Sequence, residues 1–346
     1  MNAYACAYAC ACRAIADDRD RVKARREVRR QRADMKREHL SLKKETKKEE
    51  DKLVDKACRD NASRVFSELS ATGVSRDIRE VHPMEDVLEF RSVPFALPGK
   101  KVCRFHPKHD RYMNVLPYEH SRVRLVGGRN DYINACHVRS DAKDAADFSY
   151  IATQGPLEET AGDFWAMVWQ QDVTAVVMLC DLVEDMMPKC AKYFPFRQEE
   201  SFAAGALEVT ALLVESFCPG VEHRVLEISE TATGRKRKID HFRYSDWPDH
   251  GIPDHHGSML EMSRLVRRYH PSSQVVVHCS AGIGRTGTFC MIDIALRRLK
   301  HAQAVDFNAL LVELRSSRLG MVQTWEQYYF AQKCCWTWIK ASLQNH

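Results

Sequence analysis

The stretch HCSAGIGRTG, residues 278–287, decides the fold of this chain because it contains two motifs at once. Gly282, Gly284 and Gly287 have the spacing G-x-G-x-x-G of a dinucleotide-binding loop, and a strand-like run, QVVV, comes just before it. Cys279 and Arg285, in contrast, are a cysteine and an arginine with five residues between them. The first motif would hold the pyrophosphate of a cofactor, and the second would attack a phosphate.

The cysteine and the arginine favour the second motif. A dinucleotide fold places its glycines at the first strand of a domain and follows the helix with another strand, whereas here a second helical pattern follows. The N–H groups of residues 280–285 can surround a tetrahedral dianion, and the N-terminus of the helix that begins near Arg285 favours an anion and a thiolate. We therefore predict a site of phosphate attack, with the Arg285 guanidinium binding two phosphoryl oxygens.

Composition indicates a globular, intracellular chain. The 346 residues are 45% hydrophobic, which is sufficient for a core, and no apolar run is long enough to cross a membrane, so no membrane span is expected. Thirteen cysteines, an odd number without the spacing of a disulfide framework or a zinc site, favour a reducing compartment. We expect a cytoplasmic location, with the nucleus as an alternative.

The N-terminal segment differs from the rest in its charge. Between residues 13 and 56 there are 17 Lys and Arg against 11 Asp and Glu, and the remainder of the chain is almost neutral. This segment has no Gly, Pro or aromatic residue, and its few apolar residues give no sustained heptad. We predict a charged helical or disordered arm over residues 1–60. Its mixed charge argues against a nucleic-acid partner, and the sequence identifies no other partner for it.

Strand-like and helix-like patterns interleave from residue 61 to residue 346. The predicted strands are 131–138, 148–154, 174–180, 207–214, 223–229 and 274–279, and the predicted helices are 160–171, 257–269, 285–300 and 306–318. No internal repeat or Pro- and Gly-rich linker divides this span. We therefore predict one α/β domain over 61–346, with a highly twisted mixed β-sheet flanked by α-helices.

The stretch 278–287 resembles the signature loop of the cysteine-dependent protein tyrosine phosphatases. Further stretches resemble the phosphotyrosine-specific branch in the same order, and together they cover roughly residues 105–335; they are DRYMNVLPYEHSRVRL (110–125), DYINA (131–135), YIATQGPLEETAGDFWAMVW (150–169), VVMLCDLVEDMMPKCAKYFP (176–195), HFRYSDWPDHGIP (241–253) and RLGMVQTWEQYYF (318–330). The resemblance implies a protein-tyrosine-phosphatase, a phosphoric monoester hydrolase that acts on phosphotyrosine-containing proteins in signal transduction, through a phosphocysteine and without a cofactor or metal.

The resemblance also implies catalytic roles. Cys279 corresponds to the nucleophile, Arg285 to the oxyanion clamp, and Asp249 to the general acid on a mobile loop, which then acts as the base toward water. The Thr286 hydroxyl would bond the sulfur or help to activate water. Two glutamines that position this water in the family correspond to Gln323 and Gln327.

Supporting and substrate-binding residues follow from the same resemblance. Glu184 would brace the signature arginine, and Lys189 would approach the general acid. Tyr112 would stack on the phenyl ring of the substrate, making the pocket too deep for phosphoserine. The other expected supporting residues are His278, Trp247 as the loop anchor and Gly251 as its hinge, and the other expected substrate-binding residues are Asn114, Ser280, Ala281, Gly282, Ile283, Gly284 and Gly320.

Four positions depart from the usual pattern of the family. Asp110 stands where Asn is common, Asn114 where Asp often contacts the substrate backbone, Phe194 where Trp is usual, and Thr286 where Ser is more usual. The Asn114 departure removes a charge-assisted hydrogen bond to the substrate backbone. The resemblance therefore does not predict the affinity for a peptide or the register in which the peptide binds.

Other functions remain to be considered. The run DHGIPDHH, residues 249–256, gathers acidic residues and histidines, but without a second cluster at metal spacing we expect no metal site. A catalytically weak module that only binds phosphotyrosine would normally lack the cysteine, arginine or aspartate, and all three are present. A phosphatase of broader specificity, for phosphoserine or inositol lipids, is disfavoured by Tyr112 and by a loop without the additional Lys and His of lipid-directed enzymes.

Overall fold

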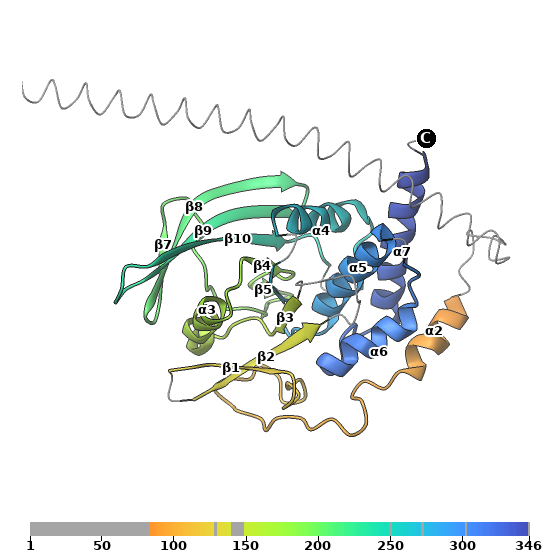
Figure 1. Cartoon of the computed structure of the whole chain (residues 1–346), viewed down its shortest axis with the longest axis horizontal. Coiled ribbons are helices and arrows are strands. Elements are labelled where there is room, and N and C mark those ends of the chain that lie inside the picture. Colours follow the sequence, from red (N-terminus) through yellow and green to blue (C-terminus); the bar gives the residue numbers. More distant parts are fainter. Residues whose placement is uncertain are drawn as a thin grey trace, which may run out of the picture. The chain divides into compact units, whose positions relative to one another are not determined.

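A computed structural model describes residues 83–127, 130–139, 149–248, 251–270, 273–301 and 303–344 (Figure 1). The arm predicted for residues 1–60 and its boundary with the domain lie outside these ranges and stay predictions. Asp249, the expected general acid, also lies outside them.

A mixed sheet of nine strands organises the described part of the chain, in the order β1-β2-β3-β11-β4-β10-β9-β8-β7. This confirms the predicted α/β class with a mixed sheet. The strands are β1 (Arg122–Arg124), β2 (Tyr132–Arg139), β3 (Ser149–Thr153), β4 (Ala175–Met178), β7 (Ser201–Ala204), β8 (Leu207–Cys218), β9 (Val221–Glu230), β10 (Lys236–Tyr244) and β11 (Val275–His278). A separate two-stranded hairpin pairs β5 (Val183–Glu184) with β6 (Met187–Pro188).

The centre of the sheet is parallel and its edges are antiparallel. β11 pairs in parallel with β3 on one side and β4 on the other, and β10 pairs in parallel with β4. Every residue of β4 and β11 is buried, as expected for parallel strands that are covered on both faces and therefore read as continuous apolar runs. The residues after β11 consequently lie at the carboxyl edge of the sheet, in its middle.

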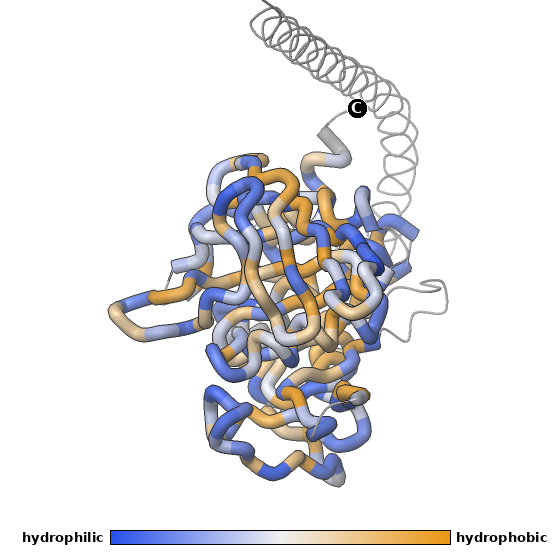
Figure 2. Tube along the Cα trace, turned by 90° about the vertical axis from the view of Figure 1, so that its left-hand side faces the viewer, coloured by the Kyte–Doolittle hydropathy of each residue, from blue (hydrophilic) through white to orange (hydrophobic). Residues whose placement is uncertain are grey.

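The helices lie on both sides of this sheet. In Figure 1, α4 to α7 are gathered toward one end of the molecule and α3 lies at the other, where it packs on β7 and β8. Figure 2 shows hydrophobic segments running through the interior and hydrophilic ones in the outer loops. The helices are α2 (Pro83–Ser92), α3 (Ala161–Gln170), α4 (Gly257–Tyr269), α5 (Gly284–Lys300), α6 (Phe307–Ser317) and α7 (Trp325–Gln344), with a short 3₁₀ turn, η1, at Glu158–Thr160.

All six predicted strands and all four predicted helices are present within a few residues of their expected bounds. α2, β10 and α7 are the longest elements that the patterns did not predict. β10 starts with the charged run Lys236, Arg237 and Lys238. Because of this run, the sequence pattern did not indicate a strand, although the second half of β10 is largely buried. α7 is rich in aromatic residues and has two cysteines, residue types with only moderate helix propensity, and it is stabilised by packing on α5.

Candidate active site

The loop between β11 and α5 surrounds the Cys279 thiol, which is 5% exposed. The Gly282 N–H and the Thr286 hydroxyl each donate to its sulfur at 3.3 Å. Gly282 has a φ of +73°, and a Cβ there would lie 2.1 Å from the Thr153 carbonyl oxygen, so only glycine fits between the loop and β3. Donors directed at a sulfur stabilise its thiolate form, which is the nucleophilic one.

A second arginine, Arg318, fixes the loop through its carbonyl groups and was not among the predicted site residues. It is fully buried, and its guanidinium donates to the carbonyls of Gly282 (2.9 Å) and Ala281 (3.1 Å) and to Asn134 Oδ1 (2.7 Å). Because a peptide carbonyl and the next N–H point in opposite directions, turning these carbonyls toward Arg318 turns the N–H groups of Gly282 and Ile283 the other way, as the bond from Gly282 to the thiol shows. The only signal in the sequence was its place at the start of the 318–330 stretch.

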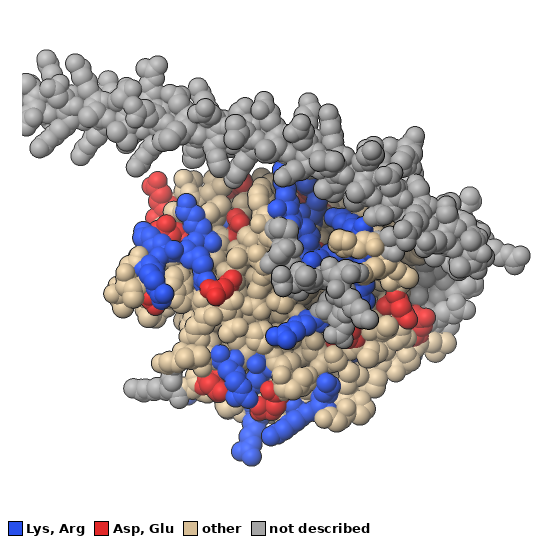
Figure 3. All heavy atoms as spheres, in the orientation of Figure 1, with Lys and Arg blue, Asp and Glu red and all other residues tan. Residues whose placement is uncertain are grey.

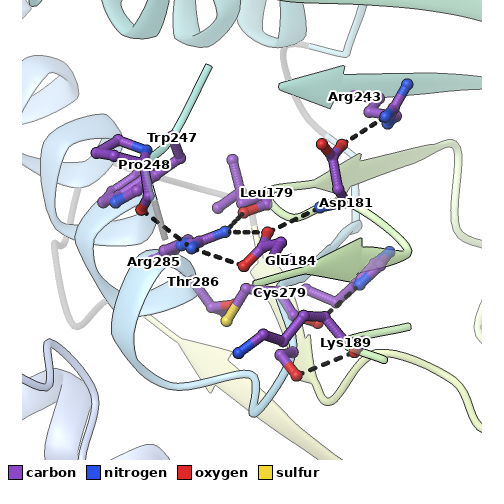
Figure 4. Close-up of polar contacts among 12 residues, drawn as sticks. Leu179, Asp181, Glu184, Lys189, Arg243, Trp247, Pro248, Cys279, Arg285 and Thr286 are labelled. Carbon is purple, nitrogen blue, oxygen red and sulfur yellow. Dashed lines mark hydrogen bonds and ion pairs between the residues drawn. The ribbon is translucent and has the colours of Figure 1, made fainter. Parts of the chain in front are cut away.

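Arg285, on the first turn of α5, is held by a carboxylate on the β5–β6 hairpin (Figure 4). Its two terminal nitrogens bind the two Glu184 oxygens at 2.6 and 2.9 Å, and they also donate to the carbonyls of Leu179 (3.1 Å) and Pro248 (3.2 Å). Burial disfavours its charge, but the ion pair with Glu184 outweighs this, so the pKa of Arg285 lies above its usual value. The guanidinium therefore stays charged and fixed in direction.

The hairpin that carries Glu184 turns sharply. Asp185 and Met186 have φ values of +46° and +58°, a left-handed pair that forms a tight two-residue turn between the strands. This turn brings Glu184 inward, where its Oε1 also accepts from the Asp181 N–H at 2.9 Å, and leaves the Met186 side chain 91% exposed.

A chain of neutral side chains supports the loop from within the sheet. The Tyr193 hydroxyl lies 2.6 Å from His278 Nε2 and 2.8 Å from His241 Nε2, and His278 Nδ1 lies 3.2 Å from the Cys279 carbonyl oxygen. Burial lowers the pKa of His278 to about 4 and that of His241 well below its usual value, so both rings are neutral near pH 7. A neutral His278 that donates through Nδ1 accepts through Nε2; hence Tyr193 donates to His278 and accepts from His241.

Phe194 follows this tyrosine and replaces the usual tryptophan of the family. Its side chain is fully buried, with its ring centroid 4.4 Å from that of His241 and 5.0 Å from the Arg224 guanidinium carbon. The smaller phenylalanine ring is thus packed against both of these neighbours. The hydrogen bonds of Tyr193 to the two histidines are present despite this departure.

Tyr112 lies at the front of the loop. Its hydroxyl is 2.9 Å from Ser280 Oγ, and because Ser280 Oγ donates to the Lys189 carbonyl (2.9 Å), Tyr112 is the donor of this pair. Neighbouring Arg111 is fastened by the carbonyls of Gly155 (3.2 Å) and Pro156 (2.7 Å). Tyr112 is therefore placed against the signature loop by two fixed neighbours.

The Asp110 departure is explained by its surroundings. Its buried carboxylate accepts from the Tyr132 hydroxyl (2.6 Å), the Asn134 amide (2.8 Å) and the His106 N–H (2.7 Å). All three neighbours are donors, which an acceptor-only carboxylate satisfies better than an amide. Burial and this carboxylate raise the pKa of Tyr132. Asn114, in contrast, is exposed, and its side chain makes no hydrogen bond to the described residues.

The segment before α4 is anchored by Trp247. Its indole N–H donates to the Gly251 carbonyl at 3.2 Å, and Gly251 has a φ of +90°. The side chains of Gln323 and Gln327 lie against the start of α5, since a Cβ on Gly284 would be 3.1 Å from both amide groups. Gly320 packs against Phe95, since a Cβ there would meet the Phe95 ring at 2.2 Å.

The surface of the described residues carries mixed charge. On the face shown in Figure 3, basic side chains lie in separate groups, some of them beside acidic ones. Within the described ranges no group of three or more His, Cys, Asp or Glu side chains is arranged to hold a metal ion. No helix in the same ranges is long and apolar enough to cross a membrane.

Comparison with known proteins agrees with this geometry. The model of the protein-tyrosine phosphatase family matches residues 106–337. Receptor-type tyrosine-protein phosphatase F of Rattus norvegicus is 41% identical over 246 residues, which are 69% of this chain and 12% of that protein. Receptor-type tyrosine-protein phosphatase S of Gallus gallus is 42% identical over 235 residues, 65% of this chain and 15% of that protein. The chain thus matches only about an eighth of the length of such relatives, and it belongs to the protein-tyrosine phosphatase family.

Proposed function

We propose that this chain hydrolyses phosphotyrosine on proteins through a phosphocysteine intermediate. The observation that carries the proposal is the Cys279 sulfur, which accepts two hydrogen bonds at the end of the central strand while Arg285 is held beside the same loop by two bonds from Glu184. A fixed cation and inward N–H groups suit the three oxygens of a phosphoryl group and the charge that develops on them.

The reaction has two steps. The Cys279 thiolate attacks phosphorus, the bond from phosphorus to the tyrosyl oxygen breaks, and we assign to Asp249 the proton that the leaving oxygen needs. Water then attacks the phosphocysteine, Asp249 takes a proton from it, and the bond from phosphorus to sulfur breaks to release inorganic phosphate and the thiolate. Gln323 and Gln327 are proposed to position this water, because their amide groups lie against the start of α5.

Specificity for tyrosine is assigned to Tyr112. Its ring stands beside the loop, fixed by the bond to Ser280, and an aromatic substrate ring stacks favourably on such a side chain. A phosphoserine side chain has no ring to stack on Tyr112. It is also shorter than phosphotyrosine, so its phosphate would not reach the loop.

We propose a cytoplasmic location and a part in signal transduction. All nine cysteines in the described ranges are free thiols, as is usual in a reducing compartment. The relatives are named receptor-type, and this chain matches a small part of their length, so the proposal covers a catalytic domain that is attached to a membrane as well as one that is not.

Phosphate release from a matched pair of peptides, one phosphotyrosyl and one phosphoseryl, tests the proposal in the presence of a chelator. We expect turnover of the phosphotyrosyl peptide alone, its complete loss in Cys279→Ser, and near wild-type turnover in the control Cys218→Ser, a partly exposed cysteine of β8. Binding without turnover, equal turnover of both peptides, or activity that survives in Cys279→Ser would overturn it.

A further inference from the structure

A surface groove lies beside Tyr112, outside the signature loop. Three segments line it: residues 107, 108 and 110–112, Leu157 with Glu159, and Met187 to Lys189 at the β5–β6 hairpin. Tyr112 and Lys189 both line the groove, and both contact Ser280 of the loop, at 2.9 Å each. The groove is therefore continuous with the proposed phosphotyrosine pocket.

The charges that line the groove fall into two groups. The opposite charges of Asp110 and Arg111 cancel. Both side chains already have hydrogen-bond partners, three donors for Asp110 and backbone carbonyls for Arg111. Lys108 and Glu159 are exposed, and among the described residues neither their side chains nor the Lys189 amine has an ion-pair or hydrogen-bond partner. Two available lysines against one glutamate leave a net positive charge.

The two residues that follow Tyr112 are uncharged and exposed. Met113 is 74% exposed, and Asn114, also exposed, stands where the sequence departs from an acidic residue. A peptide that delivers its phosphotyrosine past Tyr112 therefore meets charged side chains in the groove and uncharged ones at Met113 and Asn114.

We propose that the groove binds an acidic side chain of the same substrate, a few residues away from the phosphotyrosine. The carboxylate would reach Lys108, while Met187 and Leu157 cover the apolar stem of that side chain. An extended peptide advances about 3.3 Å per residue, so positions about two to four residues from the phosphotyrosine can reach such a neighbouring groove. The negative charge of Glu159 repels the acidic side chain and so lowers the affinity of the groove for it. The inference rests on the proposed function, since it names the substrate class of the same site.

Paired phosphotyrosyl peptides that differ only by Glu or Gln at one such position test the groove. The quantity is the ratio of kcat/KM for the Glu peptide to that for the Gln peptide. We expect the wild type to favour Glu, Lys108→Gln to lower the ratio by about 1.5- to 5-fold, and Glu159→Gln to raise it by a similar factor, the range measured for exposed charge pairs. Lys101→Gln, an exposed lysine away from the groove, is the matched control and should keep the wild-type ratio.

Opposite shifts in the two variants identify the groove, because a change in folding would move both in the same direction. A ratio near one at every position in the wild type, or equal ratios in Lys108→Gln and Lys101→Gln, would overturn the inference. If neither peptide is hydrolysed, the proposed function fails, and the groove is still tested by the ratio of the two dissociation constants. These are measured by calorimetry on the same three variants.

Discussion

The front and the back of the signature loop are built from opposite kinds of side chain. At the front, Arg285 is charged and paired with the carboxylate of Glu184. At the back, Tyr193 lies between two neutral imidazoles, those of His278 and His241. The front has to offer charge to an incoming dianion, whereas burial keeps the two imidazoles neutral because they have no charged partner.

The two arginines at the loop show the same difference. Arg285 binds a carboxylate and two backbone carbonyls, whereas Arg318 is surrounded by neutral acceptors and is buried completely. We propose that the first binds the ligand, and the second fixes the direction of peptide planes. Residues of one type thus have different roles because their neighbours differ.

The largest effect is expected at the front. Arg285→Lys keeps the positive charge but loses the planar fork that binds two oxygens, so kcat should fall by about 10² to 10³, the cost of removing one transition-state donor. Steady-state kinetics with an aryl phosphate measures it. A fall of less than threefold would show that charge alone suffices and that the fixed pairing with Glu184 has no catalytic role.

A smaller effect, on stability, is expected at the back. Tyr193→Phe leaves an imidazole acceptor and an imidazole N–H without partners, so the free energy of unfolding should fall by about 3 kcal/mol, at about 1 to 3 kcal/mol per buried group. Urea unfolding measures this change. The control is Tyr118→Phe, a buried tyrosine whose hydroxyl accepts one backbone N–H, from Leu97, and it should cost less. A large loss of kcat at unchanged stability would instead mean that the chain behind the loop acts in the chemistry.

The smallest expected effect is a loss of stability at acid pH, caused by protonation of His278. Burial lowers the pKa of His278 to about 4 in the folded protein, whereas in the unfolded chain this pKa has its ordinary value of about 6.5. The unfolded chain therefore binds the proton more readily than the folded protein does. The associated stability is complete above pH 6.5 and is lost as the pH falls toward 4, by about 2 kcal/mol between pH 7.5 and pH 5. Urea unfolding of wild type and His278→Gln over this range isolates the contribution. Parallel pH curves for the two proteins would show that His278 is not held neutral.

Local sequence was sufficient where a residue acts through its immediate neighbours. The apolar runs 174–180 and 274–279 predicted buried central strands, and Cys279, Gly282 and Arg285 predicted a phosphate loop, since a strand, a turn and a helix start lie within one short stretch. The mixed sheet was likewise predictable from the alternation of strand and helix patterns. These features depend on the backbone and on spacing along the chain.

Only the tertiary structure decided the rest, because the interactions join residues far apart in the sequence. Arg318 is 184 positions from Asn134, and Tyr193 is 85 from His278, so nothing in either local pattern distinguishes these side chains from ordinary ones. Asp110 is in place of Asn because it accepts from two donors on β2 as well as from the nearby His106 N–H, and Gly320 is needed for contact with Phe95. The sequence by itself determined the chemistry of the loop. Folding determined which side chains hold it in shape, because a buried polar group depends on its partners in space.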